Sequence, residues 1–213
     1  MHRFVWDLRL APPKGVRATY RRLDGPLVVP GNYTVKLTAN GKSSTQPLTI
    51  KMDPRVKTPQ DALVRQFELA SKLASRLGEV SLALQQAGEL RKQLAERKRE
   101  AGGNTELLTA LQELEKKVAA AVESDRDAEF GLFGIAAPGK EREPLRHVEA
   151  ALRGLLVVVE SSDLGPTSDA ASASERWDEA AREELSHWAA FQRDEVESVN
   201  ALLRNAKLKP LSM

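Results

Sequence analysis

The chain has 213 residues, no cysteine, and 32 basic against 30 acidic residues, which leave a net charge of +2. The lack of cysteine excludes disulfides, thiol nucleophiles and cysteine-based metal sites. Because the charges are mixed along the chain, composition argues against a nucleic-acid surface, which usually carries a basic stripe. No stretch approaches the roughly 18 apolar residues of a membrane span, and the first residues lack a signal-peptide pattern. We therefore expect neither nucleic acid nor membrane as a partner.

The chain opens with a predicted β-strand over residues 4–9. Phe4, Trp6 and Leu8 alternate with their neighbours, which is the period of a half-buried strand. A polar and basic loop follows. We expect this strand to be one of three, in a sheet whose single apolar face and unpaired edges need a partner. Residues 1–53 are therefore predicted to be a partial β module of a larger protein, whose opening strands are absent.

A β-hairpin is predicted next. Tyr33, Val35 and Leu37 alternate with polar residues up to Asn40-Gly41, the pair that best accepts the positive φ angles of a type I′ turn. Residues 44–52 return as the partner strand. Pro47 in that strand indicates an edge position or a bulge, because proline has no N–H to donate. We expect Trp6 and Tyr33 to pack in the core.

The remaining residues, 54–213, read as a helical bundle, so the predicted class is α+β and mostly α. Thr58 suits the N-cap of the first helix and Pro59 its first position. Apolar residues then recur at three- and four-residue spacing. The expected helices cover residues 59–101, 105–125, 144–162 and 168–206, with a loop at 126–143.

Helix lengths constrain the arrangement. The first and last predicted helices have about 43 and 38 residues, and the two middle ones about 20 each; at 1.5 Å per residue, the first is roughly 64 Å long. Laid end to end, the middle helices match one long rod. We therefore favour a three-rod antiparallel bundle or coiled coil over a four-helix bundle, which would cover half of each long helix less well.

The predicted loop at 126–143 contains an apolar run from Phe130 to Ile135. Loops with apolar residues usually pack locally, and we favour that interpretation. Docking of this run on a partner is the alternative.

One pair of residues has metal-ligand spacing. Glu184 and His187 fit the E-x-x-H pattern that places two ligands on one helix face. A di-iron bundle needs the pattern twice, and Pro144 stands at the matching position before His147. We therefore expect Glu184 and His187 to be an exposed surface pair.

Two other segments have structural interpretations. The basic run from Arg91 to Arg99, interrupted by Glu96, is expected to be a solvated helix face. Ser161-Ser162-Asp163 precedes Gly165-Pro166 and reads as a helix end. The sequence supports no catalytic, cofactor-binding or metal-binding residue, and we expect no enzyme activity and no cofactor.

Several blocks of sequence together show a family resemblance. They are Phe4-x-Trp6-Asp7-Leu8-Arg9, Pro30-Gly31-x-Tyr33-Thr34-Val35-x-Leu37-Thr38, Gln46 to Arg55, Ser162-Asp163-x-x-Pro166-Thr167 and Val199-Asn200-x-Leu202-Leu203. These blocks resemble the carboxy-terminal region of large bacterial sortilin-like β-propeller proteins, often labelled glycosyl-hydrolase or BNR-repeat proteins. The β part is similar to the Ig-like domain also found in flagellar hook-capping proteins. The resemblance implies an exported origin, periplasmic or extracellular, although this chain carries no signal peptide.

These observations lead to three functional hypotheses. The favoured one is a non-catalytic accessory or interaction module, which uses its β edge to bind an upstream β-propeller or Ig-like portion or another protein. A second is the accessory region of a glycan-acting hydrolase, whose activity would lie in the propeller. A third is a self-associating helical scaffold, which predicts a homodimer or a larger species.

Overall fold

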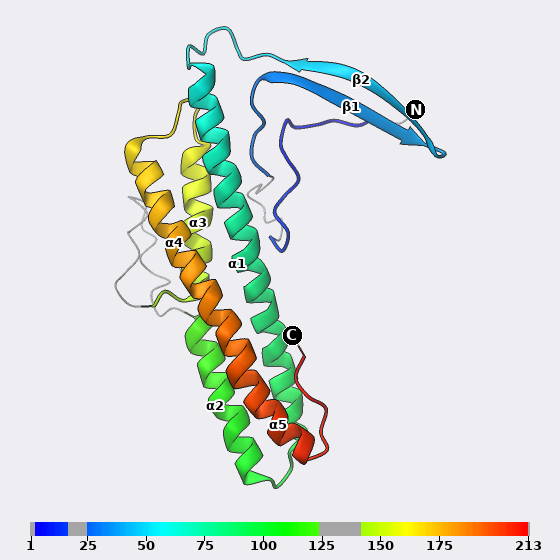
Figure 1. The fold of residues 1–213 in the computed structure, drawn as a ribbon, viewed down its shortest axis with the longest axis vertical. Coiled ribbons are helices and arrows are strands. Elements are labelled where there is room, and N and C mark those ends of the chain that lie inside the picture. Colours follow the sequence, from blue (N-terminus) through cyan, green and yellow to red (C-terminus); the bar gives the residue numbers. More distant parts are fainter. Residues whose placement is uncertain (1–2, 17–24, 124–141, 213) are drawn as a thin grey trace.

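The computed structural model describes residues 3–16, 25–123 and 142–212 and shows an α+β chain that is mostly helical, as predicted (Figure 1). A β-hairpin projects sideways from one end of a long helical bundle. The predicted loop at 126–143, with its apolar run from Phe130 to Ile135, lies outside the described residues except for its last two positions.

The hairpin consists of β1 (Gly31–Ala39) and β2 (Lys42–Ile50), paired antiparallel. Asn40 and Gly41 join them with φ angles of 50° and 74°, so the predicted two-residue turn with positive φ is confirmed. Pro47 lies opposite Thr34. In a two-stranded sheet each strand is an edge, which confirms the predicted edge position of this proline.

The predicted strand over residues 4–9 is wrong. Among the described residues the sheet has two strands, and the first segment contributes a single bridge between Arg9 and Leu27. Leu8 has a φ of 63°, which interrupts the extended backbone, and the Asp7 carboxylate accepts a hydrogen bond from the Arg9 N–H at 3.1 Å. Residues 3–16 are therefore an irregular segment, named the arm below.

The helices start and end close to the predicted positions. They are α1 (Gln60–Glu100), α2 (Thr105–Val122), α3 (Leu145–Val159), α4 (Ser168–Phe191) and α5 (Glu197–Asn205). The last predicted helix is divided, because a π-helical turn, η1 (Gln192–Val196), joins α4 to α5. No helix in the described ranges is both long and apolar enough to cross a membrane.

The bundle has three rods. α1 is one rod, α2 and α3 follow each other as the second, and α4, η1 and α5 form the third (Figure 1). Within this arrangement α1 contacts α2, α3 and α4. The three-rod interpretation is thus confirmed, and the junction between α2 and α3 falls at the predicted break.

The core forms along the predicted apolar stripes. The largest fully buried side chains are one tryptophan and a set of leucines from all three rods: Trp177, Leu73, Leu77, Leu90, Leu94, Leu107, Leu111, Leu114, Leu145, Leu152, Leu156 and Leu203. Their burial supplies the main driving force for assembly of the bundle.

The helix starts differ in how they are capped. Thr167 accepts a hydrogen bond from the Ala170 N–H at 3.1 Å and caps α4. The predicted cap of α1 is wrong, because Pro59 occupies the N-cap position. Thr58 instead donates its hydroxyl to the Asp163 carbonyl at 2.5 Å, which ties the start of α1 to the turn after α3.

Candidate functional site

The projecting hairpin has one uncovered apolar face. Residues directly opposite or alternate in a sheet share a face, so the register places five apolar side chains together: Tyr33, Val35, Leu37, Leu48 and Ile50. Val35 is 50 % exposed and Leu37 is 67 % exposed. Within the described part of the chain, no further strand pairs with the outer edge of β1 or β2. Such a face with open edges is a site for another β-structure.

The hairpin region is positively charged. Between residues 25 and 52 the acidic residues are absent, and the charged ones are Lys36, Lys42 and Lys51. A surface of one sign favours partners of the opposite sign and raises their association rate. By the strand register Lys42, opposite Ala39, shares the apolar face, whereas Lys36, opposite Thr45, lies on the other face.

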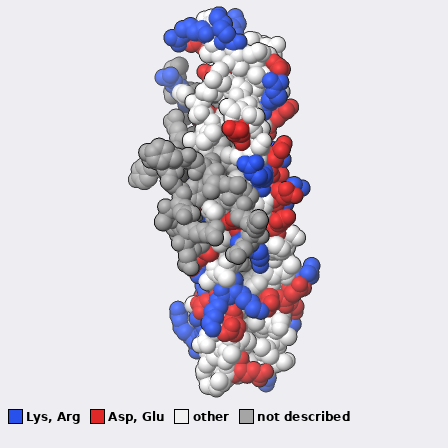
Figure 2. All heavy atoms as spheres, turned by 90° about the vertical axis from the view of Figure 1, so that its left-hand side faces the viewer, with Lys and Arg blue, Asp and Glu red and all other residues white. Residues whose placement is uncertain are grey.

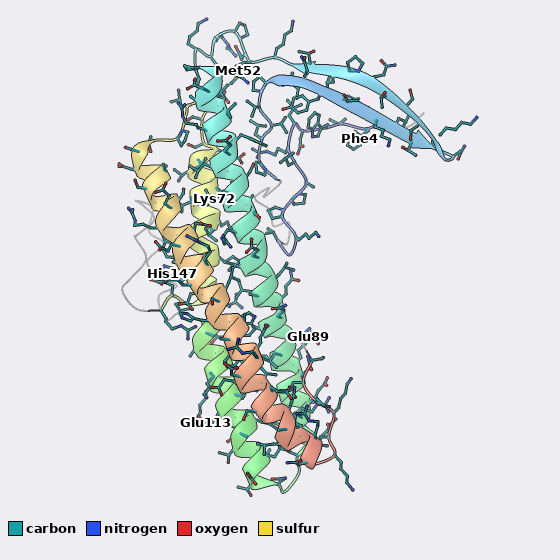
Figure 3. All side chains as sticks on the ribbon, viewed as in Figure 1. Phe4, Met52, Lys72, Glu89, Glu113 and His147 are labelled. Atoms are coloured by element: carbon teal, nitrogen blue, oxygen red, sulfur yellow. The ribbon has the colours of Figure 1, made fainter. Side chains whose placement is uncertain are left out.

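The arm adds further exposed apolar side chains beside the hairpin. Phe4 is 88 % exposed and Val5 is 71 % exposed, and Phe4 is drawn beside the strands and away from the helices (Figure 3). Trp6 packs edge-on against Tyr33 with ring centroids 5.9 Å apart. Both rings are half-buried, so the predicted packing of Trp6 and Tyr33 in a core is wrong: they cover each other at the base of an open face.

The carboxylate of Glu160, just after α3, holds the arm and the start of the hairpin on the bundle. One oxygen accepts from the Arg9 guanidinium and the other from the Leu27 N–H, both at 2.7 Å. Gln60 at the start of α1 also donates to the Pro30 carbonyl at 2.9 Å. The apolar face is thus presented by a fixed attachment and not by a loose linker.

Glu160→Ala is expected to loosen this attachment without unfolding the bundle. Removing one partner of a hydrogen-bonded charged pair costs about 1–3 kcal/mol, which corresponds to roughly tenfold or more in local opening. The rate of hydrogen exchange at the Leu27 and Val28 amides measures this local opening. Glu197→Ala, which removes an exposed carboxylate that pairs with Arg204 at 2.6 Å, is the matched control and should leave these amides unchanged. Unchanged exchange in Glu160→Ala would contradict the assigned role.

The E-x-x-H pair lies in a different environment from the one predicted. Glu184 is only 5 % exposed, so the expected exposed surface pair is wrong for the carboxylate. Arg142 donates to it at 2.8 Å, and the His187 ring nitrogen lies 3.4 Å from it. Arg142 thus forms an ion pair with Glu184 at the side of the bundle, and His187 lies beside it.

The histidine of α3 is also used structurally. His147 contacts the Glu143 carboxylate one turn earlier and packs edge-on against Trp177, with centroids 5.2 Å apart. Among the described residues, no group of three potential ligands from His, Asp or Glu is placed to hold a metal ion.

The basic run on α1 is neutralised by nearby acids. Arg91 pairs with Glu123 at 2.6 Å, and this hydrogen bond lowers the pKa of Glu123 below its ordinary value. Lys98 pairs with Glu115 at 2.6 Å. Arg97 is buried, so the prediction of a solvated face is wrong at that residue. Figure 2 shows acidic and basic side chains interspersed on the face it displays.

Sequence reasoning missed the polar residues that hold distant segments together. Glu160 joins the arm to the bundle, and Asp178 on α4 binds Arg76 on α1 at 2.8 Å. Asn200 on α5 binds the main chain of Leu211. Asn200 did carry a signal, because it lies next to Val199 on the apolar stripe, where a polar residue needs a buried partner.

Comparison with known proteins yields no relative. No family model, curated protein or solved structure matches the chain. The sortilin-like and Ig-like resemblance stays a prediction.

Proposed function

We propose that the chain is a non-catalytic accessory module that binds another protein through the apolar face of its hairpin. The main observation that supports this proposal is that Val35 and Leu37 are exposed on a sheet with two open edges. Two strands alone are marginal in water, so covering this face stabilises the hairpin as well as the complex.

The proposed partner is a β-rich protein that has an apolar face beside an open edge strand and acidic side chains around it. The chemistry of the hairpin supports this choice, because main-chain edges pair with strands, and Lys42 on the apolar face and Lys36 on the other favour acidic groups around the hairpin. The propeller or Ig-like portion implied by the family resemblance is a partner of this class. A second copy of the chain fits less well, since its hairpin would bring the same three positive charges.

The test uses a photo-crosslinking residue on either face of β1. Leu37→benzoylphenylalanine places it on the apolar face, and Lys36→benzoylphenylalanine places it on the opposite face as the matched control. In the cells that make the protein, we expect the Leu37 variant to give a covalent adduct with a β-rich protein and the Lys36 variant to give much less.

Three results would contradict the proposal. They are equal adducts from both faces, no adduct from Leu37, and an adduct with a second copy of the chain. The last of these would favour the self-associating scaffold. The mass of the purified chain, measured by light scattering, distinguishes the two hypotheses independently. The scaffold is a dimer or larger, and the accessory module is a monomer.

A further inference from the structure

The end of the chain folds back on the bundle far from the hairpin. After α5, Lys207 has a φ of 59° and the Leu208 N–H donates to the Leu203 carbonyl at 2.9 Å, which closes the helix and reverses the chain. Residues 208–212, named the tail, then run back beside α1 (Figure 1).

Two amide side chains bind the main chain of the tail. Asn200 donates to the Leu211 carbonyl at 3.1 Å and accepts from the Leu211 N–H at 2.7 Å. Gln93 on α1 does the same for Ser212, with both distances at 2.8 Å. All four main-chain groups of two consecutive residues are therefore satisfied by side chains of the bundle. Such contacts recognise an extended backbone whatever its side chains.

Leu211 is the buried side chain of the tail, and Leu208 packs partly against the core. Leu211 is 5 % exposed and packs in the cluster of buried residues, whereas Lys209 and Pro210 are exposed. Pro210 restricts Lys209, the residue before it, to extended conformations, so the chain is extended where it approaches Leu211. Leu211 is thus the anchor that the site selects by its side chain.

A groove lies beside the tail. Lys209 and Ser212 line it together with residues of α1 and α3, among them Gln86 and Glu149.

We propose that this region of α1 and α5 is a peptide-binding site for an extended segment with a leucine anchor, and that the tail is its resident occupant. Hydrogen bonds from Asn200 and Gln93 to the main chain supply affinity, and the buried position that Leu211 occupies supplies selectivity. The tail competes with any segment of this type that a partner protein supplies.

The test uses the full-length chain with Leu211→Ala, which weakens the resident tail, and a fluorescent synthetic peptide that spans residues 206–213. We expect saturable binding by anisotropy, at least about tenfold tighter than to the unsubstituted chain, because there the tail occupies most sites. The same peptide with alanine in place of Leu211 should not bind. A peptide with alanine in place of Lys209 is the matched control and should bind like the parent. Gln93→Ala in the protein should weaken binding.

Equal affinity for the substituted and unsubstituted chains, or binding by the peptide that lacks Leu211, would overturn the proposal. A second measurement needs no variant. In the unsubstituted chain, the Leu211 and Ser212 amides should exchange hydrogen faster than those of Leu90 and Leu94 in α1, since the tail opens on its own. Exchange at the same slow rate would make the tail a fixed part of the bundle, and the site would then be closed to other peptides.

Discussion

Trp177→Ala is expected to lower the unfolding free energy of the bundle by about 3–5 kcal/mol, the usual cost of deleting a buried tryptophan. Trp177 is fully buried on α4, and its ring packs edge-on against His147 of α3. Its removal leaves a cavity between two rods, which close-packed helices fill only in part. Urea unfolding followed by far-UV circular dichroism measures the loss.

Trp6→Ala is the matched control. Trp6 contacts Tyr33 of the hairpin, outside the bundle core, so the helical transition should stay within about 1 kcal/mol of the parent. Equal losses from both substitutions would mean that the hairpin and the bundle unfold as one unit, contrary to the exposure of the hairpin.

Asp178→Asn is expected to cost about 1–3 kcal/mol and to change how stability depends on pH. Asp178 is 3 % exposed and joins α4 to α1 through Arg76 at 2.8 Å and Lys72 at 3.1 Å; Figure 3 marks Lys72 on α1. Burial by itself raises the pKa of Asp178, but the hydrogen bonds from Arg76 and Lys72 outweigh it, and the pKa lies below its ordinary value.

The sign of the pH effect follows from this lowered pKa. The stabilisation is present above the pKa of the unfolded carboxyl, about 3.9, and is lost as the pH falls through the lower pKa of the folded state. The difference in unfolding free energy between the parent and Asp178→Asn should therefore be largest near neutral pH and shrink below about pH 4.

Asp61→Asn is the control for the pH series. Asp61 and Arg65 form an exposed pair at 2.6 Å, so the substitution should change stability by less than about 0.5 kcal/mol. A difference between parent and Asp178→Asn that stays constant into the acid range would contradict the assigned ion pair.

Local patterns predicted most of the fold. The apolar stripe of α1 and the Asn40-Gly41 turn depend on neighbours in sequence, and the three rods follow from helix lengths. The π-helical turn also has a local signal, because the step from Phe191 to Val196 is five residues where a regular stripe advances three or four.

The features that the sequence did not predict depend on contacts between segments that are far apart in the chain. Leu8 leaves the extended conformation in an arm that is held through Arg9 and Glu160, residues far apart along the chain. Glu184 is buried because Arg142, from outside its helix, neutralises it. The sites on the hairpin and around the tail likewise depend on contacts between distant segments. Charge or periodicity within one segment does not determine those contacts.

The uninterrupted helix α1 also sets a distance. Gln60 at its start contacts the base of the hairpin, and Gln93 near its end contacts the tail. At 1.5 Å per residue, these contacts lie about 50 Å apart along one helix. α1 therefore holds the two contact points at a fixed spacing, so molecules bound at the hairpin and at the tail site would keep a set separation. A flexible linker of the same number of residues would fix neither their separation nor their orientation.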